Sequence, residues 1–160
     1  MFLQKLNDRE KKTFLYLAQK LIKIDNKIKV VEVSLLKKLT EEMGLKMNEA
    51  VKVEDINKAW QNFTSRESRI ILLVELIEIG YVDDDFCASE NALIKEICSS
   101  FAISDTKLGL IEQWVRDERK LSASIEKFLS KEEMSCEENE KFHELKRKYE
   151  ELIQNVYNFF

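Results

Sequence analysis

The chain has 160 residues, of which 44% are apolar and 35% charged, a composition typical of one globular domain with a sizeable core. Its net charge of −4, with basic and acidic residues intermixed, argues against nonspecific nucleic-acid binding. Proline is absent and there are three glycines, which favours long helices because both residues interrupt helix interiors.

The start of the chain lacks the long apolar core of a signal peptide. The most apolar run, residues 70–82, is too short to cross a bilayer and contains two glutamates. Three cysteines without a Cys-x-x-Cys pair indicate reduced thiols, and small buried thiols are a better interpretation than zinc ligands. We therefore expect a cytoplasmic protein with no membrane span.

The first two predicted helices have clear boundaries. Asn7, followed by Glu10, is the pattern of a capping box, so the first helix begins after Asn7. Apolar residues at helical spacing then continue to the turn at Asp25. The second helix begins near Val30, and Gly44 fits as its C-terminal stop.

Four further helices follow in the pattern of apolar residues. The third is short, Glu54 to Phe63. The fourth begins after Thr64 or Ser65, runs to about Gly80, and is apolar on most sides, which predicts a central position. The fifth begins at residue 88 or 89, and the sixth is long, from residue 104 or 105 towards residue 128.

The last segment has a heptad pattern of about two and a half repeats. One interpretation is a terminal helix packed on its own domain, antiparallel to the sixth helix. The other is a seam for a homodimer or a protein partner. The apolar residues, spaced alternately by three and four, are Phe142, Leu145, Tyr149, Leu152, Val156 and Phe159.

A repeat at an offset of 58 residues links the second and fifth helices. Asp25 and Glu32 recur as Asp83 and Glu90, and the apolar positions of the two helices match as well. The end of the fourth helix matches the end of the first at an offset of 55, which makes the second turn three residues longer and marks 80–82 as an insertion.

The acids of the repeat have two interpretations. As structural residues, the aspartates form turns and the glutamates sit in the first turns of helices, where the helix dipole favours negative charge. As ligands, clustered carboxylates suit a hard divalent ion, calcium, magnesium or manganese. The spacing does not fit an EF-hand, since the loop is too short and lacks its glycine. The candidate metal ligands are Asp25, Glu32, Asp83, Asp85 and Glu90.

Nothing in the sequence indicates catalysis. His143 is the only histidine, and no serine or cysteine has the context of an activated nucleophile. A glycine-rich phosphate loop is also absent from the sequence. We expect a protein that is not an enzyme and carries no organic cofactor.

The apolar helix ending in Ile24-Asp25, with Ile28 and Glu32 following, resembles the TerB-like superfamily, which includes a tellurite-resistance protein and the N-terminal domain of a membrane-anchored J-domain co-chaperone. The match covers roughly residues 10–116. The resemblance implies an internally duplicated all-helical bundle, a metal-binding acidic surface at the matched acids, and a role in stress response. This chain departs from the family in having Asp-Asn and Asp-Asp where Asp-Gly is usual.

Together these observations predict an all-α fold: a bundle of six to seven helices with a duplicated helix-turn-helix unit and a C-terminal helical hairpin. We expect a TerB-like domain over residues 1–129, and a C-terminal helix over 130–160 that packs on it or serves as a partner seam. The predicted function is a non-enzymatic stress-response module that binds a divalent metal. The alternative is a protein-interaction module that uses the C-terminal helix, with structural acids only.

Overall fold

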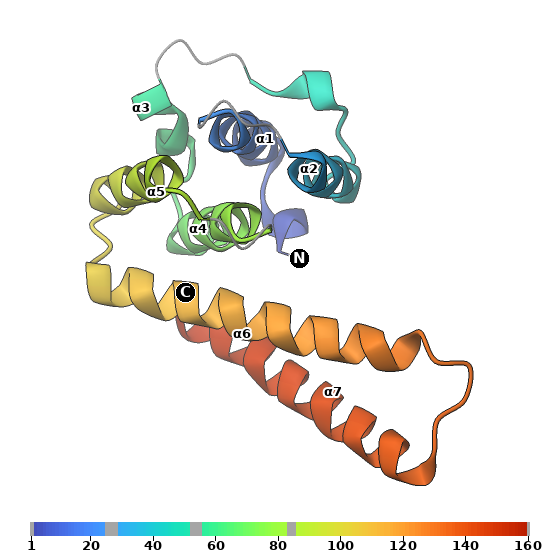
Figure 1. The fold of residues 1–160 in the computed structure, drawn as a ribbon. Coiled ribbons are helices and arrows are strands. Elements are labelled where there is room, and N and C mark those ends of the chain that lie inside the picture. The colour runs from blue at the N-terminus through green and yellow to red at the C-terminus, as the bar shows by residue number, and fades with distance from the viewer. Residues whose placement is uncertain (1, 25–28, 52–55, 83–85, 160) are drawn as a thin grey trace. The chain divides into compact units, whose positions relative to one another are not determined.

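The computed structural model describes residues 2–24, 29–51, 56–82 and 86–159. These residues form helices and their connections, without a strand in any of the four ranges (Figure 1). The all-α prediction is therefore confirmed. The chain divides into two compact units, Met1–Leu108 (unit 1) and Gly109–Phe160 (unit 2).

Unit 1 is built from two pairs of long antiparallel helices and several short turns. Its helices are α1 (Asp8–Ile22), α2 (Val30–Glu42), α3 (Ile56–Ala59), α4 (Arg66–Gly80) and α5 (Ala88–Ser100), with 3-10 turns at Leu3–Lys5, Met47–Glu49 and Trp60–Asn62. Figure 1 shows α1 and α4 in the middle, α2 beside α1 and α5 beside α4. The predicted third helix is thus shorter than its apolar pattern suggested, because the backbone tightens to a 3-10 turn at Trp60 and becomes extended at Phe63.

The starts of α1 and α4 are fixed by local hydrogen bonds. The side chain of Asn7 accepts from the amides of Arg9 and Glu10, and Glu10 accepts in return from the Asn7 amide at 3.0 Å. The Ser65 hydroxyl accepts from the Ser68 amide at 2.9 Å. Of the two expected caps of α4, Thr64 and Ser65, the cap is thus Ser65. The predicted capping box is confirmed.

The ends of α2 and α5 are matched turns. The amide of Leu45 donates to the Thr40 carbonyl, and the amide of Ile103 donates to the Cys98 carbonyl. Donor and acceptor of the second bond lie 58 residues after those of the first. The residue inside each turn has a left-handed backbone, with φ of 69° at Gly44 and 54° at Ala102. This is the Schellman arrangement, in which the left-handed residue lets the last amides reach back to unpaired carbonyls.

The two helix pairs agree in length and spacing. The pair α1 and α2 and the pair α4 and α5 begin and end at positions that differ by 58 throughout. Residues 80–82 are therefore not an insertion, and that prediction is wrong. A shift of three residues leaves an apolar pattern on nearly the same helix face, so the match at offset 55 was ambiguous. That the two pairs superpose in three dimensions stays a prediction.

Gly80 is the last residue of α4, and the aromatic ring of Phe86 lies against it. A Cβ atom at this position would meet two ring atoms of Phe86 at 2.5 Å, closer than real Cβ atoms approach. Phe86 also stacks on Tyr81, with ring centroids 4.9 Å apart. Close packing against the Phe86 ring therefore requires glycine here. Backbone conformation does not, since the φ of Gly80 is outside the left-handed region.

The helix α4 is buried on every side, as its sequence predicts. Residues 70–77 all lie in the interior, and α1, α2 and α5 pack around them. One of these residues is the carboxylate Glu75, which is fully buried. Its Oε1 accepts a hydrogen bond of 2.8 Å from the backbone amide of Phe2, so α4 holds the N-terminal segment 73 residues away in sequence.

Unit 2 is an antiparallel hairpin formed by α6 (Asp105–Leu129), which begins at the end of unit 1, and α7 (Cys136–Val156). The Trp114 indole donates to the Leu152 carbonyl at 2.8 Å, and the Tyr149 hydroxyl donates to the buried Glu118 carboxylate at 3.0 Å. Tyr149 and Leu152 of the heptad pattern therefore contact α6. A seam for a homodimer or a partner stays a prediction.

The boundary between the units lies within α6, after Leu108, whereas the sequence suggested a boundary after residue 129. Helix caps mark where a helix begins, but they do not tell which neighbours its later turns contact. The C-terminal part of α6 packs on α7 through Trp114, Glu118 and Phe128, whose ring centroid lies 6.0 Å from that of Phe142. That part consequently belongs with α7.

Candidate functional site

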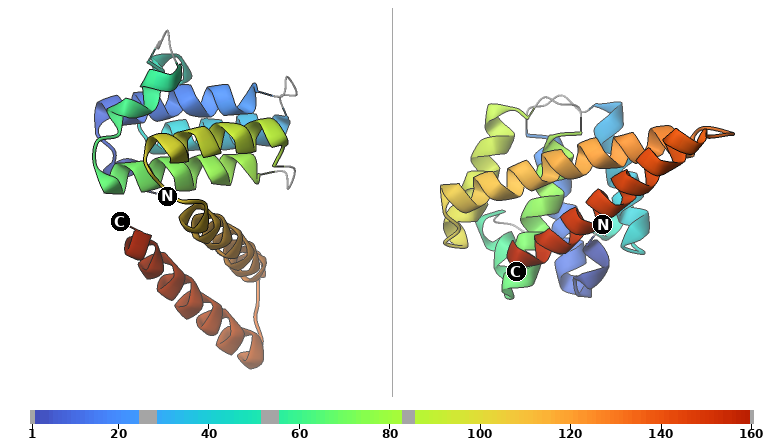
Figure 2. Two further views of the ribbon diagram at one scale, coloured as in Figure 1. Left: turned by 90° about the vertical axis from the view of Figure 1, so that its left-hand side faces the viewer. Right: turned by 90° about the horizontal axis from the view of Figure 1, so that it is seen from below.

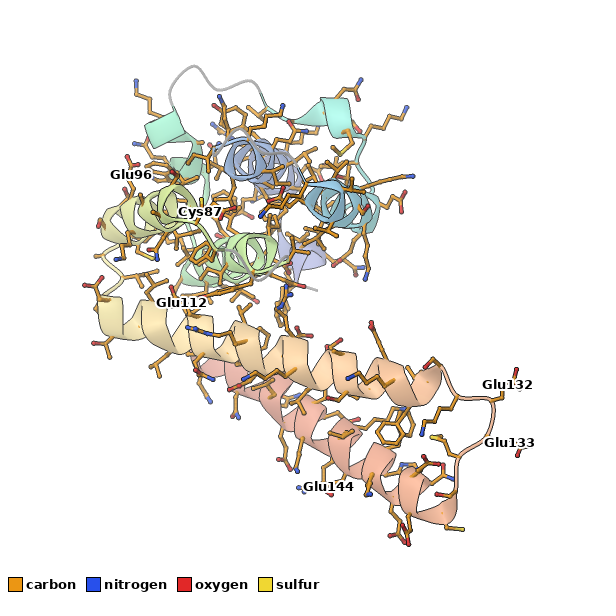
Figure 3. The ribbon with its side chains drawn as sticks, in the orientation of Figure 1. Cys87, Glu96, Glu112, Glu132, Glu133 and Glu144 are labelled. Atoms are coloured by element: carbon orange, nitrogen blue, oxygen red, sulfur yellow. The ribbon has the colours of Figure 1, made fainter. Side chains whose placement is uncertain are left out.

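The two glutamates of the repeat occupy the same position in their helices. Glu32 and Glu90 are third in α2 and α5, and each is only 5% exposed. Glu32 Oε2 accepts from the Lys29 amide, and Glu90 Oε2 from the Cys87 amide, both at 2.8 Å. Cys87 is the residue that precedes α5, as Figure 3 shows.

These hydrogen bonds give both glutamates a structural role. A carboxylate that accepts from the amide before a helix satisfies an otherwise unpaired donor and lies near the positive end of the helix dipole. The charge assistance offsets part of the cost of burying each carboxylate. The structural interpretation is thus confirmed for Glu32 and Glu90.

The three candidate aspartates, Asp25, Asp83 and Asp85, lie outside the described residues. Their neighbours show where the two turns are anchored: α2 and α5 begin at the same end of unit 1, the end at which α1 and α4 finish (Figure 2). Within the described ranges, no group of three or more histidine, cysteine or acidic side chains could hold a metal ion. The glutamates therefore form a site only together with the aspartates that precede them.

The donor chemistry of these residues fits a hard divalent cation. Every candidate ligand supplies carboxylate oxygen, which calcium, magnesium and manganese prefer. In both glutamates the hydrogen bond to the backbone uses Oε2, so the side chain is held in one orientation. A ligand oriented in this way loses less side-chain entropy when a cation binds.

Two sites formed by the structure were not predicted from the sequence. The first, here called the cationic pocket, is lined by Arg66, Arg69 and Lys107 with apolar neighbours. The second, the hairpin groove, lies between α6 and α7 and has Phe128 and Leu145 among lysines. Both bring together residues distant in sequence. The clustered arginines at 66 and 69 are a local signal of the cationic pocket, and Leu145, a residue of the predicted partner seam, is a signal of the hairpin groove.

The three thiols have different surroundings. Cys98 is buried, Cys87 is half-buried, Cys136 is exposed, and none forms a disulfide. Cys98 agrees with the interpretation of small buried thiols, Cys87 does so only in part, and the interpretation is wrong for Cys136. That the thiols are reduced stays a prediction. It is the first residue of α7, where the helix begins at the surface.

The described residues include no helix that is both long and apolar enough to cross a membrane.

His143 is exposed, and its ring centroid lies 6.0 Å from that of Phe142. Trp60 and Trp114 are buried, 3% and 5% exposed, and belong to the core.

Comparison with known proteins gives one match. The family model of tellurite resistance protein TerB matches residues 11–113, more than half of the chain and most of unit 1. No curated protein matches the chain, and no solved structure does either. Three long helices of unit 1, α2, α4 and α5, lie inside the matched range together with the two glutamates, and α1 lies inside it from residue 11 onward. This chain belongs to the tellurite resistance protein TerB family.

Proposed function

We propose that the protein is a non-enzymatic stress-response module that binds a divalent cation at the end of unit 1 where α2 and α5 begin. The observation that carries the proposal is the matched pair of buried glutamates, Glu32 and Glu90, held in the same orientation in two helices that start at one end. Asp25 and Asp83 precede them by the same seven residues. Membership of the TerB family supports the stress-response part of the proposal.

In this proposal the carboxylates of Asp83, Asp85 and Glu90 bind the cation, and those of Asp25 and Glu32 complete the site. The bound ion supplies positive charge that relieves repulsion between the carboxylates. The role of the cation is then to stabilise and order this end of unit 1, and no chemical step follows from it.

Metal binding predicts a rise in thermal stability. At one hundred times the dissociation constant, a ligand that binds only the folded state adds about 2.7 kcal/mol, which raises Tm by roughly 5–11 °C in a chain of this size. Asp83→Asn combined with Asp85→Asn should abolish the rise, because the two substitutions remove two of the proposed carboxylate ligands. Melting followed by circular dichroism with calcium, magnesium and manganese measures both effects.

The matched control is Glu132→Gln with Glu133→Gln. These two acids lie in the exposed connection between α6 and α7, directed away from both helices (Figure 3). The control removes the same charge and should leave the metal-induced rise intact. A wild-type Tm that is unchanged by all three ions contradicts the metal proposal.

The hairpin groove supports a second candidate function, the docking of a partner protein. The groove has a volume of about 540 Å³, with Phe128 and Leu145 in its apolar part. Four lysines also line it, at positions 127, 131, 141 and 148, with Glu144 as the one acidic residue. Lysines beside an apolar strip fit an acidic amphipathic helix, which lays its apolar face into a groove.

Two of the four lysines are already paired. Lys148 forms an ion pair of 2.6 Å with Glu144, which lowers the pKa of that carboxyl. Lys131 pairs with Glu138, and this hydrogen bond, with one from the Ser135 amide, lowers the pKa of Glu138 to about 2. Lys127 and Lys141 have no ion pair within the described part of the chain, so they are the lysines most available to a partner.

A labelled 18-residue peptide with leucines on one helical face and glutamates on the other tests this docking. We expect micromolar binding by fluorescence anisotropy, and about tenfold weaker binding to Lys127→Glu with Lys141→Glu, because like charges then face the peptide. Lys120→Glu, an exposed position in α6 outside the groove, is the control. Equal binding of a peptide with lysines in place of glutamates would contradict the role of charge.

A further inference from the structure

The cationic pocket lies at the end of unit 1 where α4 begins and α5 ends. Its volume is about 330 Å³, and its lining includes Arg66, Arg69 and Lys107 but no acidic side chain. Because α4 and α5 are antiparallel, this is the end opposite to the one at which α2 and α5 begin. None of the candidate metal ligands is therefore part of the pocket.

Arg69 is fixed in place by its neighbours. Its Nε donates to the Phe63 carbonyl at 2.9 Å, and its guanidinium carbon lies 5.1 Å from the ring centroid of Phe101. Backbone and ring thus hold the planar guanidinium on two sides, and its remaining N–H groups keep a defined direction. An arginine oriented before binding is well suited to an oxyanion, because little side-chain entropy is then lost.

Lys107 and Arg66 bring two further positive charges together. Burial is the larger cause that lowers the pKa of Lys107, and the nearby charge of Arg66 lowers it further. Both side chains also line the same pocket, so the two cations lie near each other and repel. An anion placed between them would convert this repulsion into attraction.

The backbone around the pocket also favours negative charge. Arg66 is the first residue of α4, and Lys107 lies in the first turn of α6. The N-terminus of a helix carries a partial positive charge and unpaired N–H groups. Two long helices thus start beside the three cationic side chains.

The remaining lining is apolar. Ile70, Phe101 and Ile103 contribute carbon surface, and Ile70 is 1% exposed. The volume is near the lower end of the range of about 300–1,000 Å³ that is typical of small-molecule pockets. The combination suits a ligand with an anionic head and a small apolar body, rather than a bare inorganic ion.

We propose that the cationic pocket binds a small organic phosphate monoester. The phosphate dianion contacts Arg66, Arg69 and Lys107, and the organic body rests on the apolar lining. Guanidinium groups match the geometry of phosphate oxygens, and lysine adds a point charge. This site is independent of the proposed metal site, since it shares no residue with it.

Isothermal titration calorimetry of the full chain with phenyl phosphate tests the proposal. We expect binding that weakens as salt concentration rises, because charge contributes most of it. Arg66→Gln and Lys107→Gln should each weaken binding about tenfold or more, as expected for the loss of a charged hydrogen-bond partner. Chemical-shift changes should be largest at the amides of Ala102 and Ile103, which line the pocket.

Arg9→Gln is the matched control, because Arg9 is an exposed arginine in the first turn of α1 and lies outside the pocket. It should bind phenyl phosphate as the wild type does. Absence of binding at millimolar phenyl phosphate, or equal weakening in Arg9→Gln, would overturn the site. Inorganic phosphate and tellurite serve as oxyanions without an organic body, and equally tight binding of either would overturn the assignment of a monoester.

Discussion

Glu75→Ala is expected to lower the free energy of unfolding by about 3–5 kcal/mol, one of the two largest effects predicted for this chain. The substitution removes a fully buried side chain from the centre of α4 and leaves a cavity. It also leaves the buried amide of Phe2 without the carboxylate to which it donates at 2.8 Å. Loss of this buried hydrogen bond adds its own cost to that of the cavity.

Glu75→Gln separates these causes, because its side chain fills nearly the same space and its carbonyl oxygen still accepts a hydrogen bond. We expect it to cost less than half as much as Glu75→Ala. Glu96→Ala, at an exposed position of α5 (Figure 3), should change stability by no more than about 0.5 kcal/mol. Urea denaturation followed by circular dichroism gives these values. If Glu75→Ala remains within about 1 kcal/mol of wild type, the carboxylate does not hold the N-terminal segment.

Leu39→Ala and Ile97→Ala should each cost about 2–4 kcal/mol, and the two losses should agree to within about 1 kcal/mol. The two residues occupy equivalent places in α2 and α5, at the offset of 58, and are 5% and 0% exposed. Both substitutions remove a similar number of buried carbon atoms. Equal losses are what a duplicated unit with equivalent packing requires.

Val33→Ala provides the control for these core positions, since Val33 belongs to α2 but is 44% exposed. It should cost a few tenths of a kcal/mol at most. Urea denaturation curves of the three variants give the free energies of unfolding. These are compared with a common m-value, the slope of the free energy against urea concentration. A loss above about 3 kcal/mol in one helix with less than about 1 kcal/mol in the other would show that the two copies pack differently.

Local signals in the sequence predicted the helix boundaries well. The Asn7 and Glu10 pair, Ser65 and Gly44 each act within a few residues of themselves, and the structure places a cap or a stop at each. The third helix was less predictable, because an apolar pattern does not distinguish an α-helix from a 3-10 turn over three or four residues. The supposed insertion at 80–82 arose from a similar ambiguity of pattern.

Long-range contacts limit how much of the candidate sites could be predicted from the sequence. The acids of the repeat were found because they recur at a fixed offset, and two of them, Glu32 and Glu90, do lie in matched positions. Nothing local indicates that Glu75 accepts from Phe2, or that Lys107 meets Arg66. These contacts depend on how the helices pack, and the sequence gives only the faces that are available for packing.

Gly44 and Ala102 occupy matched backbone turns, but the two positions differ in how freely their residues can be substituted. At Gly44 any L-residue would introduce the strain of a left-handed backbone, roughly 1–2 kcal/mol, so substitution is resisted. At Ala102 that strain is already present, and a different exposed side chain adds little to it. Position 102 also lines the cationic pocket. The second of the two matched turns thus has a position at which a binding surface can diversify while the end of α5 is kept.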